Sequence, residues 1–254
     1  MKKIVNVICV CFAVVLAQAQ TKLNITTDKT TSLVFPFAIK HVDRGTSSVL
    51  AQQIKEAPEI LLIKAAAKDF TETNLSVVTD DGSVYAFTVT YDNKPSVWVL
   101  YLPVNRTATI SSYANMILDN ERTVKKIKDK KYNLQAGVRG IYIKDNIIYY
   151  QLYINNEATI DYDVELLRFF IKDKKRSKRT AVQEVEQKPV YTTGNHNKVK
   201  GNSSTIFLMA LEKFTIPDKK YLAIQITEKN GGRHFLLRIT NKNIMKSKVL
   251  PDLK

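Results

Sequence analysis

Six basic side chains stand close together in the second half of the chain and are the first candidates for chemistry. Asp173 is the one acid among them. Such a cluster attracts phosphates, anionic lipids or an acidic protein surface, and charge alone does not choose among the three. The cluster contains no aromatic residue to stack on nucleobases, as single-strand binders do. We interpret it as an exposed loop tip that is either only solvated or the first candidate for contact with an anionic protein or lipid partner. Its members are Lys172, Lys174, Lys175, Arg176, Lys178 and Arg179.

Patterns for catalysis and metal binding are weak. The chain has no G-x-S-x-G elbow, no P-loop and no G-x-G-x-x-G motif. The three histidines lie in separate segments, and none belongs to a pair at metal-ligand spacing. Three acids alternate on one face of an expected strand without the glycine-turned loop of calcium sites, so we interpret them as a solvated face balanced by lysines. We expect no enzymatic activity, no cofactor and no metal; the residues considered are His41, His196, His234, Asp161, Asp163 and Glu165.

The N-terminus has the pattern of a secretory signal peptide. Two lysines precede an apolar stretch at residues 4–16, and Ala17-Gln18-Ala19 supplies the small-x-small cleavage pattern. The apolar stretch is shorter than the roughly 20 residues that span a bilayer. Both cysteines, Cys9 and Cys11, lie in this segment, so cleavage after Ala19 leaves a chain without thiols or disulfides. We expect an exported protein.

Charge is divided unevenly along the chain. Residues 20–120 contain 9 Lys and Arg against 10 Asp and Glu, a net charge of −1. Residues 121–254 contain 28 against 14, a net charge of +14. The positive field therefore belongs to the C-terminal half, and an anionic partner would meet that half. A nucleic-acid-binding protein is the main alternative function on these grounds.

The N-terminal half has the periodicity of strands. Residues 73–92 form the clearest hairpin, with alternating apolar residues on both sides of Asp81-Gly82, which suits a tight turn. Residues 33–45 also alternate, and Pro36 within them favours an edge strand or a bulge. Strands at this spacing, with no helical pattern between them, predict a β-sandwich. Further strands are expected at residues 59–67 and 97–103.

The following section changes character. Residues 111–131 place a few apolar side chains among many charges, behind Ser111 or Ser112 as a possible N-cap. We predict a helix with a thin apolar stripe that connects two β domains. Its apolar face is too sparse for a free membrane-surface helix.

The C-terminal half returns to strands. Residues 137–156 predict a hairpin around Asp145-Asn146, and residues 222–240 predict another that turns at Gly231-Gly232. A polar stretch rich in Gly, Asn and Ser is typical of a loop, and it covers residues 191–204. Two further strands are expected at residues 160–173 and 180–186.

Several of these segments resemble a known family. The resemblance is to the TraN family of Bacteroides-type conjugative transposons and runs over nearly all of the chain after the signal segment. The N-terminal half also resembles, more weakly, the N-terminal β-sandwich of the CagX-type periplasmic subunit of type IV secretion systems. The residues that carry the TraN resemblance are Tyr162-Asp163, Leu167-Arg168-Phe169, Lys178-Arg179-Thr180-Ala181, Phe214-Thr215 and residues 228–233.

The resemblance implies a part in conjugative transfer. It implies a cell-envelope subunit without enzymatic activity or cofactor. This subunit would lie in the periplasm, associated with the outer-membrane complex. Its partners would be other subunits of the apparatus and, in a possible ring, copies of itself. It offers no catalytic residues. We thus predict a mainly β protein with two β-sandwich-like domains joined by a short helical or irregular connector, and direct contact with DNA is not expected. The predicted parts are a signal peptide at 1–19, an N-terminal domain at 20–108, a connector at 109–136 and a basic C-terminal domain at 137–254.

Overall fold

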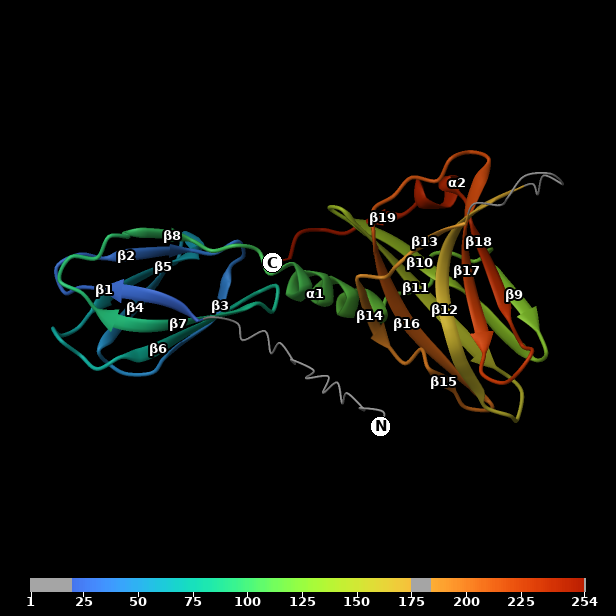
Figure 1. Cartoon of the computed structure of the whole chain (residues 1–254), viewed down its shortest axis with the longest axis horizontal. Helices are drawn as coiled ribbons and strands as arrows, with labels where there is room; N and C mark the ends of the chain where they lie inside the picture. The colour runs from blue at the N-terminus through green and yellow to red at the C-terminus, as the bar shows by residue number, and fades with distance from the viewer. Residues whose placement is uncertain (1–19, 175–183, 254) are drawn as a thin grey trace, which may run out of the picture. The chain divides into compact units, whose positions relative to one another are not determined.

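The computed structural model of the chain describes residues 20–174 and 184–253 (Figure 1). The protein is mainly β, as predicted, and the contacts divide it into two units. The first unit ends at Leu102, and the second runs from Pro103 and also includes Asp80–Ser83. Neither helix in the described part of the chain is long and apolar enough to cross a membrane. The predicted signal peptide at residues 1–19 lies outside the described residues.

The first unit is a β-sandwich of two four-stranded sheets. One sheet has the order β1-β7-β6-β3 and the other has the order β4-β5-β2-β8. Apolar side chains from both sheets, among them Leu33, Ile63, Leu75 and Phe87, are fully buried between them. The strands are β1 (Thr21–Ile25), β2 (Thr31–Val34), β3 (Ile39–Arg44), β4 (Val49–Ile54), β5 (Ala57–Ala65), β6 (Thr73–Thr79), β7 (Val84–Tyr91) and β8 (Val99–Tyr101).

The hairpin expected at residues 73–92 is confirmed as β6 and β7, with Gly82 at a φ of 78° in the turn. The prediction of one strand at residues 33–45 is wrong. The chain leaves β2 before Pro36 and enters β3 at Ile39, in the opposite sheet. Because proline has no N–H to donate to a ladder, it suits the corner where the chain changes sheets. The apolar alternation runs through the corner because Phe35 is also buried in the core.

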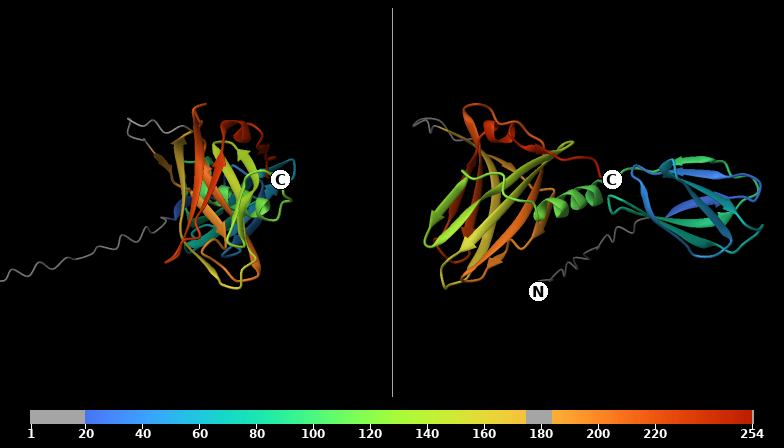
Figure 2. Two further views of the ribbon diagram at one scale, coloured as in Figure 1. Left: turned by 90° about the vertical axis from the view of Figure 1, so that its right-hand side faces the viewer. Right: turned by 180° about the vertical axis from the view of Figure 1, so that it is seen from behind.

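The second unit is a larger β-sandwich (Figures 1 and 2). One sheet has the order β14-β16-β11-β10-β19, with β9 also paired to β10; the other has the order β13-β12-β17-β18, with β15 also paired to β12. The strands are β9 (Lys128–Lys131), β10 (Leu134–Lys144), β11 (Ile147–Asn156), β12 (Tyr162–Asp173), β13 (Val185–Gln187), β14 (Tyr191–Gly194), β15 (Lys198–Val199), β16 (Ser203–Glu212), β17 (Lys220–Glu228), β18 (Phe235–Ile239) and β19 (Lys248–Val249); a short helix, α2 (Asn241–Ile244), precedes β19.

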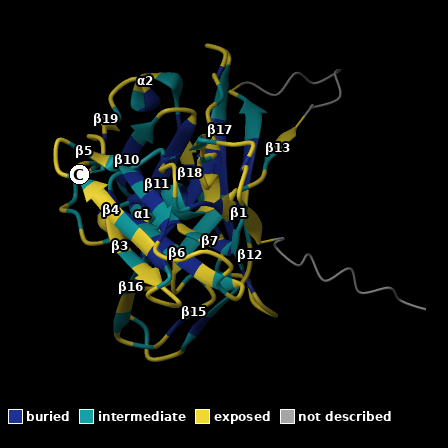
Figure 3. Ribbon diagram, turned by 90° about the vertical axis from the view of Figure 1, so that its left-hand side faces the viewer, coloured by how far each residue is buried: buried dark blue, intermediate teal, exposed yellow. Residues whose placement is uncertain are grey.

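Strand β11 shows how one sequence serves two packing layers. Tyr150, Leu152 and their even-numbered neighbours point into the core between the sheets. Tyr149 and Gln151 point to the outer face, since successive side chains alternate, and they are nevertheless buried. Helix α1 (Arg106–Leu118) covers them there. The colouring of Figure 3 shows how burial changes from segment to segment along the strands.

Helix α1 begins and ends earlier than the predicted helix at residues 111–131. The N-cap is Asn105, whose Oδ1 accepts a hydrogen bond from the Ala108 N–H at 3.3 Å, and not Ser111 or Ser112. At the other end, Gln151 Nε2 donates to the carbonyls of Ile117, Leu118 and Asn120 at 3.0–3.1 Å.

Helix α1 is also not a free connector. It buries Ile110, Tyr113, Ala114 and Ile117 against the second sandwich, and the charged segment after it continues into β9. Residues 109–136, predicted as the connector, therefore belong to the second unit.

The structure also corrects the predicted loop at residues 191–204 and describes only part of the strand predicted at residues 180–186. Residues 191–204, predicted as a loop, contain the short strands β14 and β15. Strand β14 pairs with β16 at the edge of its sheet, where polar Thr192 and Thr193 are compatible with solvent on one side. Of the strand expected at residues 180–186, the described part contains β13, which starts at Val185.

Candidate functional site

The basic cluster of the sequence does not assemble an anion site in its described part. Lys172 lies in β12, forms an ion pair with Glu184 at 2.9 Å and is 15% exposed. Lys174 Nζ donates to the backbone carbonyl of Asp218 at 2.6 Å. Both ammonium groups therefore have partners within the chain. The other four candidates, Lys175, Arg176, Lys178 and Arg179, lie outside the described residues.

The alternating acids behave as a balanced surface. Lys198 Nζ lies 2.8 Å from Asp161 and 3.6 Å from Asp163. The hydrogen bond from Lys198, helped by the Gly201 N–H, holds the pKa of Asp161 below its usual range. No group of three His, Cys, Asp or Glu side chains placed to hold a metal ion occurs in the described part of the chain.

Residues from two separated segments of the TraN resemblance meet in one place. Arg233, just before β18, donates from Nε to Glu228 Oε1 at 2.7 Å and from Nη2 to the Asp161 carbonyl at 2.7 Å. Its backbone N–H donates to Glu228 Oε2 at 3.0 Å, and its carbonyl accepts from the Tyr162 hydroxyl at 2.9 Å. The Arg233 guanidinium also lies over the Tyr162 ring. We call Tyr162, Glu228 and Arg233 the Arg233 clamp.

The clamp holds the β17–β18 turn against the start of β12. Hydrogen bonding to Arg233 lowers the pKa of Glu228, although burial opposes that change. The hairpin predicted here is confirmed, but the left-handed backbone belongs to Asn230, at a φ of 52°, and not to either glycine. Gly231 has a different role, because a Cβ there would lie 2.2 Å from Glu228 Oε2 and would displace the carboxylate that Arg233 holds. The residues of the Arg233 clamp and of the adjoining turn therefore have a structural role.

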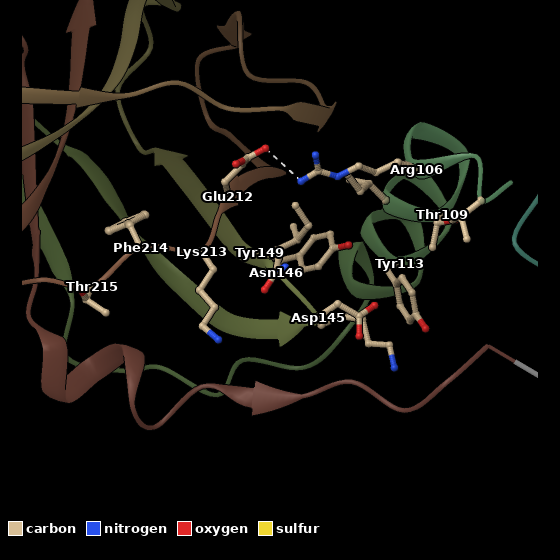
Figure 4. A pocket seen from close by; sticks show the side chains of 14 residues that line it. Arg106, Thr109, Tyr113, Asp145, Asn146, Tyr149, Glu212, Lys213, Phe214 and Thr215 are labelled. Atoms are coloured by element: carbon tan, nitrogen blue, oxygen red, sulfur yellow. Dashed lines mark hydrogen bonds and ion pairs between the residues drawn. The ribbon is translucent and has the colours of Figure 1, made fainter.

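The segment Phe214-Thr215, which also carries the resemblance, lies in a different setting. It lines an open groove of about 790 Å³ within the second unit (Figure 4). Three elements form the groove: the first half of α1, the turn between β10 and β11, and the chain just after β16. We call it the α1 groove, and it is lined by Val104, Arg106, Thr109, Ile110, Tyr113, Lys144, Asp145, Asn146, Ile147, Tyr149, Glu212, Lys213, Phe214 and Thr215.

The α1 groove has an apolar floor. Tyr113 of α1 and Tyr149 of β11 are buried side by side, with ring centroids 6.4 Å apart. Burial raises the pKa of Tyr149, so its hydroxyl remains protonated at neutral pH. Ile110 and Ile147 are buried beside these rings.

The rim of the α1 groove is charged. Arg106 on α1 forms an ion pair with Glu212 at the end of β16, with Nη2 and Oε1 3.0 Å apart, and Figure 4 marks this contact. Lys144 is paired with Asp252, and this hydrogen bond raises the pKa of Lys144. Lys213 is exposed at the rim and has no ion pair with any residue that the structure describes.

The α1 groove combines buried apolar residues with charged side chains. Among the described residues, its lining contains no histidine, and of its two carboxylates, Asp145 and Glu212, the second is already held by Arg106. An apolar floor within a polar, solvent-accessible rim is the usual composition of a protein–protein interface. The groove is therefore suited to a segment of another protein.

Comparison with known families agrees with the boundaries of the fold. Residues 107–249, which run from α1 to β19 and exceed half of the chain, match the family described as Domain of unknown function (DUF4138). The chain belongs to the DUF4138 family. Residues 23–95, within the first unit apart from the hairpin tip, match a second family described as Domain of unknown function (DUF8473). A search of curated proteins found no match.

The sequence does not predict the α1 groove. Its rim joins Arg106 to Glu212, which are 106 positions apart, and no local spacing indicates such a pair. The one available signal was Phe214-Thr215, noted only as part of the resemblance. The alternation in residues 148–154 does not indicate the aromatic floor, because it assigns the even-numbered side chains to the core and the helix that covers Tyr149 is predicted at other residues.

Proposed function

We propose that the protein is a non-enzymatic cell-envelope subunit of a conjugative transfer apparatus of the type IV secretion kind. In this proposal it is exported to the periplasm, associates with the outer-membrane complex and contacts other subunits. The resemblance to TraN proteins supports this function, and the signal-peptide pattern supports export. The two β-sandwich units agree with an assembly role, since such units expose large surfaces on a rigid frame.

One observation carries the proposal further. Among the residues of the TraN resemblance, Tyr162 and residues 228–233 lie at the Arg233 clamp, and Phe214-Thr215 lie at the α1 groove. The clamp holds the fold together, so its residues need no partner to explain them. Phe214-Thr215 instead lie beside an open groove with an apolar floor and a charged rim. We assign the α1 groove to the docking of a neighbouring subunit of the apparatus.

The first test of the function is genetic. Deletion of the gene from a conjugative donor should reduce transfer to background, and the native gene should restore it. A tagged copy should purify from the envelope together with other transfer subunits. Normal transfer from the deletion strain would contradict the proposed function. Salt-sensitive binding of duplex DNA by the purified chain, without co-purifying subunits, would favour a nucleic-acid-binding protein instead.

The second test addresses the α1 groove. The variant Lys213→Glu with Thr215→Arg changes two exposed rim side chains and leaves the core intact. It should accumulate normally, fail to restore transfer and lose co-purifying subunits, because an altered charge pattern and added bulk at an interface oppose docking. The matched control is Lys68→Glu with Thr71→Arg, which makes the same changes at exposed residues of the first unit. Equal transfer by both variants would remove the groove from the proposal and leave the function standing.

A further inference from the structure

A second groove lies in the same unit, on the outer face of the six-stranded sheet. Tyr153 follows Tyr149 and Gln151 on that face of β11 because side chains alternate, and it lies beyond the end of α1, which Gln151 caps. The groove there measures about 240 Å³. We propose that it binds carboxylate groups of an acidic segment of a partner protein. We call it the Tyr153 groove.

Two arginines supply its charge. Arg122 and Arg139 both line the groove, and no Asp or Glu lines it with them. Neither arginine forms an ion pair with any residue in the described part of the chain. A guanidinium presents its donors in a planar fork that matches a carboxylate, and such charge-assisted bonds are among the stronger ones.

Backbone carbonyls position the two guanidinium groups. Arg122 Nε donates to the Val124 carbonyl at 2.8 Å, and Arg139 Nε donates to the Asn120 carbonyl at 3.4 Å. Arg122 Nη2 reaches the Tyr153 hydroxyl at 3.2 Å and the Lys125 carbonyl at 3.3 Å. Within the described residues, Arg122 Nη1 and both terminal nitrogens of Arg139 therefore still have donors for a ligand. Because these side chains are already oriented, less conformational freedom is lost on binding.

Tyr153 adds a neutral donor. Its hydroxyl oxygen accepts from Gln135 Nε2 at 2.6 Å and from Arg122 Nη2 at 3.2 Å. Both neighbours are donors, so the hydroxyl hydrogen is available to an incoming acceptor. Three donor side chains thus converge on one open site, and an anion satisfies them together.

The surroundings favour a protein carboxylate over nucleic acid or lipid. The Arg122 guanidinium already lies over the Tyr153 ring, 4.9 Å from its centroid, and the ring also packs closely on Gly137. No other aromatic residue lines the groove, so nucleobases have no stacking platform. Ile206 is the one aliphatic residue of the lining, too little apolar surface for acyl chains. The nearby Glu157 is held by Lys130 at 3.2 Å and by Asn155.

This inference does not depend on the proposed function, because the Tyr153 groove and the α1 groove share no lining residue. The Tyr153 groove would provide the positively charged half of the chain with a preformed binding site for an anionic partner.

Calorimetric titration of the full chain with poly-L-glutamate tests the proposal. The native chain should bind, and the variant Arg122→Gln with Arg139→Gln should bind at least about tenfold more weakly, because it removes both charged donors that a carboxylate would meet. The matched control is Arg238→Gln with Lys242→Gln, which removes the same charge from exposed residues of β18 and α2. The control should bind nearly as well as the native chain.

Two further variants keep the test decisive. Arg139→Gln alone removes one long hydrogen bond and leaves the packing in place, so it should fold normally and still weaken binding. Tyr153→Phe should weaken it less, because it removes one neutral donor. Absence of poly-L-glutamate binding, or equal weakening in the charge-matched control, would overturn the proposal. So would binding of a single-stranded oligonucleotide or of phosphatidylserine vesicles that depends on both arginines while poly-L-glutamate binding does not.

Discussion

Two arginine–glutamate pairs in the second unit have the same chemistry and opposite surroundings. In the Arg233 clamp, the side chains of Arg233 and Glu228 are 18% and 10% exposed. At the rim of the α1 groove, those of Arg106 and Glu212 are 60% and 62% exposed. Arg233 and Glu228 are five positions apart in one hairpin, whereas Arg106 and Glu212 are 106 positions apart, and only the first pair is largely buried.

The difference decides what each pair can do. A buried ion pair must satisfy nearly all of its hydrogen-bonding atoms within the protein. In the clamp, Arg233 donates to the Asp161 carbonyl and its backbone N–H donates to Glu228, while its own carbonyl accepts from Tyr162. An exposed pair exchanges freely with water and contributes little to stability. Arg106 and Glu212 can therefore exchange their ion pair for contacts with a partner protein at a small cost in free energy. The clamp stabilises the fold, whereas the rim pair is suited to binding.

The largest expected effect comes from breaking the clamp. Arg233→Ala leaves Glu228 withdrawn from water without its cation, and we expect the free energy of unfolding to fall by about 3 kcal/mol. Chemical denaturation of the native and variant chains measures this difference. Arg106→Ala is the matched comparison and should change stability by less than about 1 kcal/mol. If the two variants were equally stable, the contrast between the pairs would be wrong.

The clamp also predicts a dependence on pH. Because Arg233 lowers the pKa of Glu228 in the folded chain, its stabilisation is present above the ordinary glutamate pKa of about 4.3 and is lost as the pH falls through the folded value. The free energy of unfolding of the native chain should therefore fall more steeply in acid than that of Arg233→Gln. Other carboxylates with a lowered pKa, such as Asp161 and Glu186, remain in both chains and cancel in the comparison. If the free energies of unfolding of the two chains instead changed in parallel with pH, Glu228 would not be the group responsible for the pH dependence.

Local signals predicted the hairpins well. The turns at Asp81-Gly82 and at Asp145-Asn146 both contain residues with positive φ, namely Gly82 and Asp145. Such residues can be identified from a few neighbouring positions, because the turn itself selects them. The β class followed from the same short-range alternation.

Tertiary contacts account for what the sequence did not predict. Helix α1 begins at Arg106 because Asn105 caps it, and its buried face exists only because β11 supplies Tyr149 and Gln151 beneath it. The charged segment after α1 looked helical but forms β9 against β10. Likewise both grooves, and the contact of Tyr162 with Arg233 in the clamp, join residues from distant segments, so no spacing within one segment could reveal them.

The rim pair gives the smallest expected effect and the sharpest test of the contrast. A double-mutant cycle with Arg106→Ala, Glu212→Ala and both together should give a coupling energy below about 1 kcal/mol, as for exposed pairs elsewhere. The equivalent cycle at Arg233 and Glu228 should give a clearly larger value. If the rim pair instead coupled as strongly as the clamp, Arg106 would be a structural tie between α1 and β16. The charged rim would then be fixed in place, and a docking segment would depend on Lys213 and the apolar floor of the groove alone.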